Sequence, residues 1–552
     1  MVVTVHITDI NWSKSYYHPG EVASAAVTVH SEVPEPIPAS LVVQISDLNG
    51  SLARLEQSLT LKGGDQILSI TWDPPTDSPH GYGVDLELQS QSGGTLSTAS
   101  TAFDVLERWT QMPRYGFLTD FGPGRTDAAE TMAGLVKYHI NALQFYDWMY
   151  RHDQFLTAQD PYEDPLGRTL SIKTVNALID AAHTRGIDAM PYTAIYASSL
   201  EFYHAHPDWA MRNADGTTMF FGENFLVYMD PRPDSKWIHY LLDQFDQILE
   251  KTAFDGIHLD QYGNPKVAYD SNGQPYDVGA ALAEVINATH AHVTALRPNG
   301  AVVFNAVTNW PIEQVAPADE DIVYIEVWPP YTTFLNLEQL VVQGQVYGHG
   351  KPVVLAAYID PSLVHNVRLM EALIFASGGG HIELGEQDDM LQEAYFPRYG
   401  KMSPALVEIL RRDYEFAIRY QNATGPESTD ASSEYRNRIQ VGSYSSDVSR
   451  EKDIVLPIVR TSGDYTAVNL VNMLGIPTAE WLTPLPADPT PLGATPVSIS
   501  DVTRPVAHVW MASPDGEDAS LHELPFKLEG GRLSFQIPSL QYWDLILIQW
   551  GA

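Results

Sequence analysis

The sequence predicts a three-part protein in which a central (β/α)8 barrel is flanked by two antiparallel β-sandwiches. The 552 residues suffice for about three to four domains of about 150 residues each. Eight strand-like runs alternate with helix-length amphipathic segments in the middle of the chain, and short strands between turn residues occupy both ends. We therefore place the N-terminal sandwich at residues 1–110, the barrel at 111–424 and the C-terminal sandwich at 425–552.

The composition excludes several classes of protein. Hydrophobic residues make up 44% of the chain, which is enough for buried cores. The 69 acidic and 32 basic residues give a formal charge of −37, which repels phosphate backbones and anionic lipids, so we expect neither nucleic acid nor a membrane as partner. The chain contains no cysteine, which excludes disulfides, zinc–thiolate sites, iron–sulfur clusters and thiol nucleophiles.

The N-terminal region contains strand-like segments such as 25–30, 41–45 and 82–88, and turn residues separate them at short intervals. This spacing is typical of an antiparallel sandwich. Residues 1–6 lack the basic stretch followed by an apolar stretch of a signal peptide, and we interpret them as a strand. We expect an extracellular monomer whose leader is absent from this sequence; a cytoplasmic protein is the alternative.

The middle region repeats a strand-then-helix pattern eight times. The predicted strands are 115–120, 142–147, 187–194, 256–260, 302–306, 323–327, 353–358 and 381–384. The predicted helices are 128–138, 172–184, 236–250, 280–296, 312–315, 335–342, 363–375 and 404–420. Eight such units in about 310 residues fit one (β/α)8 barrel, whereas a doubly wound sheet rarely needs eight.

The C-terminal region returns to strands after a Ser/Asp/Glu-rich link at residues 427–434. Its last two apolar runs, 533–538 and 543–549, predict a closing hairpin. We expect this region to form a small sandwich that packs on the barrel.

The residues at the strand ends are the candidates for chemistry, because active sites of such barrels lie at the C-terminal ends of the strands. These ends are rich in carboxylates and aromatic rings. Aromatic rings stack on sugars while carboxylates and amides bind sugar hydroxyls, so this edge predicts a carbohydrate site. The residues that we expect to bind substrate are Asp147, Asp120, Trp148, Tyr196, His258, Gln261, Asn305, Trp328, Tyr358 and Glu383.

Two carboxylates suit the cleavage of a glycosidic bond, which needs one carboxyl group to attack or activate water and another to protonate the leaving group. Asp260 and Glu326 each end an apolar run, 254–260 and 322–326, where a carboxylate faces the barrel mouth. Taken singly, either residue could instead form a salt bridge at the rim or cap a helix. Together with the aromatic rim they predict a catalytic pair. His258 shares a strand face with Asp260, so it either contacts substrate or carboxylate or belongs to the barrel core.

No metal and no organic cofactor is expected. The chain contains no His-Glu-x-x-His sequence, and the acidic run at 386–389 lacks the spaced ligands of a calcium loop. The glycines at 378–380 precede a strand rather than open a helix, so they do not predict a phosphate-binding loop.

Five segments, in this order along the chain, resemble glycoside hydrolase family 66: residues 115–121, 143–149, 192–197, 256–263 and 324–328. That family comprises endo-dextranases and cycloisomaltooligosaccharide glucanotransferases. The resemblance covers about residues 1–552, and it implies an N-terminal immunoglobulin-like domain, a (β/α)8 barrel and a C-terminal β-sandwich.

The resemblance implies a retaining double displacement on α-1,6-linked glucan, with dextran and isomaltooligosaccharides as partners. Asp260 is similar to the nucleophile of the family, Glu326 to its acid/base, and Asp147 to the acidic residue that holds the sugar in the cleaving subsite. Retention implies carboxyl groups only about 5–5.5 Å apart. Glu326 must then keep its proton in the free enzyme, and the nearby charge of Asp260 raises its pKa.

Within the family, the sequence favours an endo-dextranase that releases isomaltooligosaccharides. Cyclising members carry an inserted carbohydrate-binding module near the end of the barrel, whereas only a helix and the short acidic link precede the C-terminal sandwich here. The cyclising glucanotransferase is the alternative. A hydrolase for another linkage and a non-catalytic glucan-binding barrel are further alternatives, and the presence of both Asp260 and Glu326 argues against the last.

Overall fold

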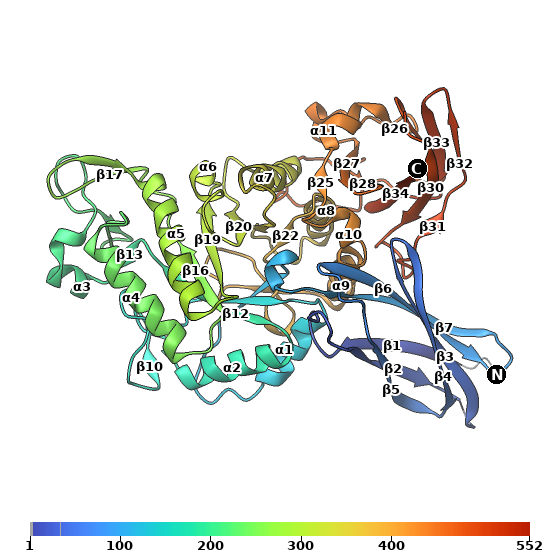
Figure 1. Ribbon diagram of the computed structural model, residues 1–552, viewed down its shortest axis with the longest axis horizontal. Helices are drawn as coiled ribbons and strands as arrows, with labels where there is room; N and C mark the ends of the chain where they lie inside the picture. The colour runs from blue at the N-terminus through green and yellow to red at the C-terminus, as the bar shows by residue number, and fades with distance from the viewer. Residues whose placement is uncertain (1–3, 34, 552) are drawn as a thin grey trace.

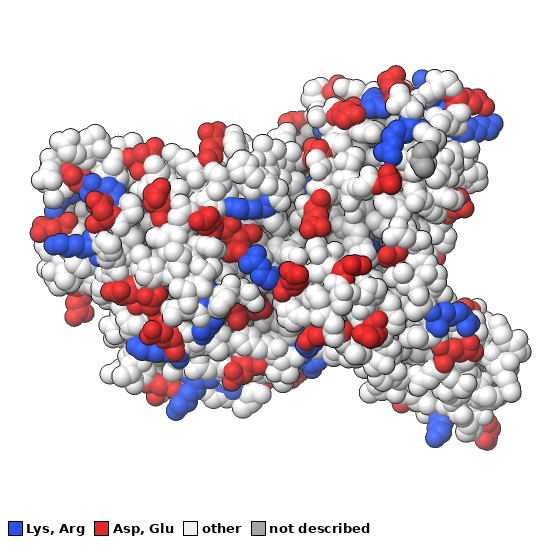
Figure 2. Space-filling model, viewed as in Figure 1, with Lys and Arg blue, Asp and Glu red and all other residues white. Residues whose placement is uncertain are grey.

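The computed structural model describes residues 4–33 and 35–551. The central barrel forms one end of the molecule, and the N-terminal and C-terminal sheets lie side by side at the other end (Figure 1). Carboxylates are spread over all three regions on the face shown in Figure 2. Within the described residues, no helix is long and apolar enough to cross a membrane.

Seven strands form two antiparallel sheets in the N-terminal region, with orders β1-β2-β5 and β4-β3-β6-β7. Along β2, buried and half-buried residues alternate, so one face of the sheet packs on the core. The expected strand at residues 1–6 begins at Val5 in the structure, and residues 1–3 lie outside the described residues. The strands are β1 (Val5–Trp12), β2 (Ala23–Ser31), β3 (Ile37–Asp47), β4 (Gly50–Leu61), β5 (Gly64–Trp72), β6 (His80–Ser90) and β7 (Thr95–Val105).

Eight parallel strands form the barrel in the order β8-β9-β12-β16-β19-β20-β21-β22. The amide of Phe117 in β8 donates to the carbonyl of Leu384, three residues after β22, over 3.0 Å, which joins the first strand to the last. Each predicted strand overlaps one of these eight, so the predicted barrel is confirmed. The strands are β8 (Tyr115–Leu118), β9 (Ala142–Phe145), β12 (Asp188–Ala194), β16 (Gly256–Asp260), β19 (Ala301–Val307), β20 (Ile322–Glu326), β21 (Val353–Ala356) and β22 (Gly380–His381).

Helices cover the outside of the barrel and also match the predicted ranges. In α4, the buried residues Trp237, Leu241, Phe245 and Ile248 recur every three to four positions, and the Ser235 side chain accepts a bond from the first turn. This pattern turns one face of the helix to the strands. The helices are α1 (Ala128–Val136), α2 (Ile172–Thr184), α4 (Lys236–Lys251), α5 (Val278–Leu296), α6 (Ile312–Val315), α7 (Phe334–Tyr347), α8 (Val364–Ala376) and α9 (Pro404–Arg419).

Insertions follow several strands at their C-terminal ends, which is the edge where barrel enzymes build their sites. The longest lies between β12 and α4 and contains a three-stranded sheet and α3. The inserted elements are β10 (Tyr162–Glu163), β11 (Thr169–Leu170), β13 (Ala197–Ser198), α3 (Leu200–Ala205), β14 (Phe220–Phe221), β15 (Leu226–Tyr228), β17 (Val267–Tyr269), β18 (Pro275–Asp277), β23 (Asp389–Met390) and β24 (Gly400–Lys401).

The C-terminal region contains a six-stranded sheet, β25-β27-β28-β34-β30-β31, and a four-stranded sheet, β26-β29-β33-β32. The predicted closing hairpin is wrong, because β33 and β34 belong to different sheets, and residues 538–542 cross between them. The elements are α10 (Gln421–Thr424), β25 (Thr429–Asp430), α11 (Ser432–Tyr435), β26 (Ile439–Val441), β27 (Val455–Ser462), β28 (Tyr465–Asn472), β29 (Thr495–Ile499), β30 (Val506–Ala512), β31 (His522–Glu523), β32 (Phe526–Glu529), β33 (Arg532–Ile537) and β34 (Trp543–Trp550).

Buried ion pairs join the N-terminal sheets to the barrel. Arg114, just before β8, donates to both carboxylate oxygens of Asp104 in β7 over 2.7 and 3.0 Å. Arg419 in α9 likewise donates to both carboxylate oxygens of Asp85, over 2.8 and 2.7 Å. Such bidentate pairs fix the orientation of the groups they join. The domain limits at residues 110 and 424 and the immunoglobulin-like type of the N-terminal sheets stay predictions.

Candidate active site

The candidate site is built at the ends of three neighbouring strands. Asp260 is the last residue of β16, Glu326 is the last residue of β20, and Asn305 lies in β19 between them. The Asn305 amide nitrogen donates to Asp260 Oδ1 over 2.8 Å and to Glu326 Oε2 over 2.9 Å. These two oxygens therefore lie no more than 5.7 Å apart, close to the spacing of a retaining pair.

A tyrosine holds the other oxygen of each carboxylate. Tyr192 in β12 donates to Asp260 Oδ2, and Tyr358, two residues after β21, donates to Glu326 Oε1, each over 2.7 Å. Every oxygen of the pair therefore has one side-chain donor. All these donors are neutral, so they fix the positions of the carboxylates without compensating their charge.

The electrostatics of the pair follow from burial. Burial raises the pKa of Asp260 to about 7, and the charge of Glu326 adds to the rise, while the bonds from Tyr192 and Asn305 oppose it. Burial also raises the pKa of Glu326, and hydrogen bonds from Asn305, Tyr358 and Trp328 oppose that rise. Two such close carboxyl groups interact strongly, so they titrate as a coupled pair.

The pair opens into a pocket of about 620 Å³, a size typical of ligand sites. Four of the predicted substrate contacts line it together with Asp260 and Glu326: Asp147, Tyr196, Gln261 and Trp328. Asn305 and Tyr358 reach the site through their bonds to the pair. The structure therefore brings six of the ten predicted contacts to one place.

Asp147 lines the pocket from two residues after β9, and its backbone has a left-handed φ of +52°. Arg168, next to β11, donates to the Asp147 carbonyl over 2.9 Å and lies 3.6 Å from its carboxylate. Arg168 also pairs with Asp164 over 2.6 Å. Burial raises the pKa of Asp147 to about 7 although Arg168 opposes the rise.

The predicted sugar contact of Trp148 is wrong. Its ring is 0% exposed and packs 4.8 Å from the ring of Phe254, and its N–H donates to the Tyr192 carbonyl over 3.2 Å. Asp147 lines the pocket from a turn with left-handed backbone, whereas the next side chain, Trp148, points into the protein.

The predicted sugar contact of Glu383 is also wrong, because this side chain belongs to a closed cluster that we call the buried triad: Glu371, His381 and Glu383. His381 Nδ1 lies 2.8 Å from Glu371 and 3.5 Å from Glu383, and Nε2 lies 3.0 Å from the Ala357 carbonyl. Burial alone lowers the pKa of His381, but the charges of Glu371 and Glu383 raise it to about 10.

Among the described residues, the buried triad has the spacing of metal ligands, since its possible ligand atoms lie within 4.8 Å of one another. Both ring nitrogens already have hydrogen-bond partners, and Tyr414 donates to Glu383 over 3.1 Å. The triad therefore places an imidazolium beside two carboxyl groups inside the protein, and burial and Glu383 raise the pKa of Glu371 to about 8 although His381 opposes the rise.

Two other predicted contacts lie outside the pocket. The His258 ring is buried in the barrel and bonds the Tyr115 hydroxyl over 2.9 Å, and burial lowers its pKa to about 3. The structure thus places His258 in the barrel core, which was one of the two readings of the sequence. Asp120 is exposed, but its carboxylate accepts the Gly122 amide over 2.9 Å and does not line the pocket.

The sequence reasoning missed Arg168 and several aromatic side chains. Phe221 and Phe225, from the insertion after β12, line the pocket, as do Tyr262 and Tyr395. Tyr262 could have been found, because it follows Asp260 by two residues. The insertion residues carry no periodic signal, since their elements are only two or three residues long.

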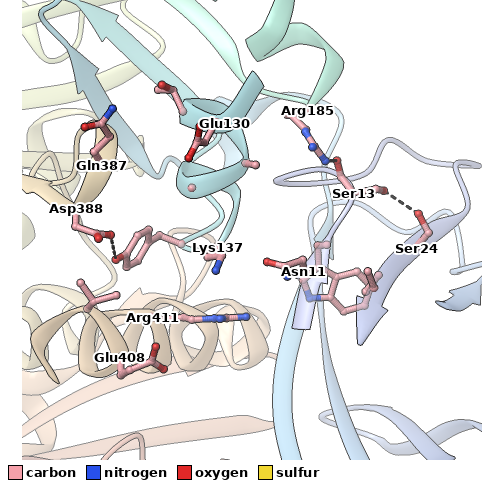
Figure 3. Close-up of a pocket in the computed structure, with 18 of the residues that line it drawn as sticks. Asn11, Ser13, Ser24, Glu130, Lys137, Arg185, Gln387, Asp388, Glu408 and Arg411 are labelled. Carbon is pink, nitrogen blue, oxygen red and sulfur yellow. Dashed lines mark hydrogen bonds between the residues drawn. The ribbon is translucent and has the colours of Figure 1, made fainter. Parts of the chain in front are cut away.

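A larger cavity of about 920 Å³ lies between the first N-terminal sheet and helices α1 and α9 (Figure 3). Acidic and basic side chains alternate around it, including Glu130, Lys137, Arg185, Glu408 and Arg411. Ion pairs such as Arg411 with Asp9 compensate these charges. The reaction is therefore assigned to the smaller pocket, where the carboxylate pair meets the strand ends.

Known proteins resemble this chain over nearly its whole length. A cycloisomaltooligosaccharide glucanotransferase from Niallia circulans is 26% identical over 701 residues, covering 97% of this chain and 71% of that protein. A dextranase from Streptococcus salivarius is 22% identical, covering 73% of this chain and 57% of that protein. The structure of a Paenibacillus sp. cycloisomaltooligosaccharide glucanotransferase complexed with cycloisomaltoheptaose has the same fold, with a TM-score of 0.91 at 22% identity, covering 99% of this chain and 100% of that chain. Glycosyl hydrolase family 66 matches residues 12–547, and the chain belongs to this family of enzymes.

Proposed function

We propose that the protein cleaves α-1,6-linked glucan with retention and transfers the glucosyl chain to a sugar hydroxyl, as a cycloisomaltooligosaccharide glucanotransferase. One observation carries the retaining mechanism: the Asn305 amide holds oxygens of Asp260 and Glu326 within 5.7 Å of each other. This separation leaves no room for a water between sugar and carboxylate, as an inverting mechanism needs.

In the first step, the Asp260 carboxylate attacks the anomeric carbon and forms a glucosyl ester, while Glu326 gives its proton to the departing glycosidic oxygen. The raised pKa of Glu326 keeps this proton available. The bonds from Tyr192 and Asn305 hold Asp260 in line for attack.

In the second step, Glu326 acts as the base. The ester has no charge, so the pKa of Glu326 falls and it can accept the proton of an acceptor hydroxyl. The acceptor oxygen bonds to the anomeric carbon and Asp260 departs as a carboxylate. When the acceptor is the free end of the same chain, the product is a ring; when the acceptor is water, the product is linear.

Asp147 is the residue that we assign to the sugar in the cleaving subsite. Its backbone strain and its contacts to Arg168 hold the carboxylate at the pocket wall. A carboxylate fixed in this way can accept two hydroxyl hydrogen bonds and orient the sugar for attack.

The relatives support transfer over hydrolysis, because two similar glucanotransferases each cover 97% of this chain, whereas the dextranase covers 73%. Endo-hydrolysis of dextran, which the sequence favoured, is the second candidate. The alignment with the first glucanotransferase extends over 701 residues, so that relative contains segments that this 552-residue chain lacks. This difference is the observation that favours hydrolysis.

Mass spectrometry of the products from a long unbranched dextran tests the proposal. Rings consist of whole anhydroglucose units, whereas linear products carry one additional water. We expect rings among the products. A ladder of only linear isomaltooligosaccharides would make the protein an endo-dextranase, and the absence of any product would refute action on this linkage.

A further inference from the structure

Two exposed aromatic rings stand directly beyond the two catalytic carboxylates. Tyr262 follows Asp260 by two residues and is 46% exposed, and Trp328 follows Glu326 by two residues and is 39% exposed. Of the six aromatic side chains that are exposed in the described part of the chain, Tyr262, Trp328 and Phe225 line this pocket. Exposed rings gathered at one cleft indicate a binding surface.

The strand order sets the spacing of the two backbone segments that carry these rings. Strand β19 lies between β16 and β20, so the backbones that carry Tyr262 and Trp328 are two strand spacings apart, about 10 Å. Atoms in van der Waals contact are about 4 Å apart, so a sugar ring stacked between two aromatic faces needs about 8 Å between those faces. The backbone spacing is therefore compatible with one glucosyl residue between the two side chains.

Each of the two rings packs against other aromatic rings. Tyr262 packs against the rings of Phe221 at 4.3 Å and Tyr196 at 6.1 Å, and Trp328 packs against Tyr358 at 5.9 Å. A ring that is already held in place loses little entropy when a ligand stacks on it.

The backbone is strained at Thr308, which lines the same pocket as the two rings. Thr308 directly follows β19 and has a φ of +57°, a conformation that β-branched residues rarely adopt. Its amide donates to the Glu326 carbonyl over 2.9 Å, and its side chain lines the pocket. Strain of this kind persists where the surrounding structure enforces it, and it concentrates at ligand sites.

We propose that Tyr262 and Trp328 form an acceptor platform, which binds the glucosyl residue whose hydroxyl attacks the ester on Asp260. This inference rests on the proposed function. Glu326 protonates the leaving oxygen, so a ring next to Glu326 lies on the leaving-group side, and the acceptor enters from that side.

The platform sets the partition between transfer and hydrolysis. A glucosyl residue between the rings displaces water from Glu326 and places its own hydroxyl there. The hydroxyl proton passes to Glu326, the acceptor oxygen bonds to the anomeric carbon, and the ester bond to Asp260 breaks. Without the platform, water competes for the same ester.

α-Isomaltosyl fluoride tests this role, because fluoride departs without an aglycone, so the acceptor enters only in the second step. The protein is given this substrate with increasing concentrations of isomaltose as acceptor. The ratio of transfer product to hydrolysed donor is measured, and the hydrolysed donor is the fluoride released minus the transfer product. We expect Trp328→Ala and Tyr262→Ala each to lower this ratio about tenfold, which corresponds to the loss of one stacking contact of about 1.4 kcal/mol.

Two conservative variants and one distant variant are the controls. Tyr262→Phe and Trp328→Phe keep a ring, and we expect them to retain most of the transfer ratio. Tyr399→Ala removes an exposed ring that does not line the pocket, and we expect the wild-type ratio. Ratios within twofold of wild type in both alanine variants would overturn the platform, and so would an equal loss in Tyr262→Phe. If the unaltered protein released no fluoride, the proposed function itself would fail, and the platform with it.

Discussion

The barrel holds two pairs of buried carboxylates, and each pair is bridged by one nitrogen-bearing side chain. The proposed catalytic pair, Asp260 and Glu326, shares the neutral amide of Asn305. In the buried triad, His381 with its pKa raised to about 10 lies between the two carboxylates. The first pair opens into the pocket, whereas the side chains of the triad are fully enclosed.

The difference shows what makes a buried carboxylate reactive. A neutral bridge fixes the geometry but leaves the charges uncompensated, so burial raises both pKa values. A cationic bridge compensates only part of the charge, because burial and Glu383 raise the pKa of Glu371 to about 8 although His381 opposes the rise. Full enclosure leaves these carboxylates with a structural role. The two sites should therefore respond to substitution in opposite ways.

Asp260→Asn should give the largest effect. The amide cannot form the ester, so the turnover number should fall by a factor on the order of 10⁴, about 5.5 kcal/mol in activation free energy. The midpoint of thermal unfolding should stay the same or rise slightly, because the substitution removes a buried charge. Dextran turnover and thermal scans check both expectations. A variant that kept a tenth of the activity would remove Asp260 from the role of nucleophile.

His381→Gln should do the reverse, with a loss of stability that exceeds its effect on turnover per folded molecule. Removing the cation leaves two carboxylates without compensation, which should cost about 3 kcal/mol of unfolding free energy. Denaturant unfolding at pH 6 measures this loss.

The pH dependence gives the triad a second test. The folded pKa of His381 is about 10, above its ordinary 6.5, so its contribution is fully present below pH 6.5 and is lost as the pH rises toward 10. The difference in stability between wild type and His381→Gln should therefore shrink over this range. A constant difference would mean that His381 is neutral in the folded protein.

The sequence predicted the barrel, and it placed Asp260 and Glu326 at strand ends, because both depend on local pattern. Apolar runs that end in a carboxylate identify the strand, its end and the acid together, as Asp260 and Glu326 show. Trp148 and Glu383 were misplaced because both follow the last strand residue, Trp148 after the left-handed Asp147 and Glu383 after β22, where strand alternation no longer gives the direction of a side chain. The partners of Glu383 come from α8 and β22, and no local pattern connects these elements.

Asn305→Ala should have an intermediate effect, because it removes the bridge and leaves both carboxylates. Asp260 and Glu326 then each lose the hydrogen bond from Asn305. Turnover of dextran should fall about 10²-fold, as on loss of a single preorganised donor. Steady-state kinetics check this value. If the turnover number stayed within threefold of wild type, the two tyrosines alone would suffice to position the pair.

The two tyrosines should shift opposite limbs of the pH profile. Tyr358 lowers the pKa of Glu326 through its hydrogen bond, so Tyr358→Phe raises that pKa, and the loss of activity at alkaline pH should move to higher pH. Tyr192 lowers the pKa of Asp260, so Tyr192→Phe should move the acid limb to higher pH. A hydrogen bond of about 1 kcal/mol corresponds to a shift of somewhat less than one pH unit. Profiles of kcat/KM that move on the same limb in both variants would contradict the assignment of base and acid.

Thr308→Gly should give the smallest change, a gain in stability. Glycine adopts a φ of +57° without strain, and this relief exceeds the additional chain entropy that glycine loses on folding, so the unfolding free energy should rise by about 0.5–1 kcal/mol. The neighbouring variant Asn309→Gly is the matched control. Asn309 has the same φ but donates to Gln343 over 2.7 Å, so its replacement should lower stability.

Because Thr308 also lines the pocket together with Tyr262 and Trp328, the stabilised variant should transfer less to sugar and more to water. Stability that rises with an unchanged ratio would separate the strain at Thr308 from the acceptor platform, and equal losses in both variants would show that Thr308 stores no strain.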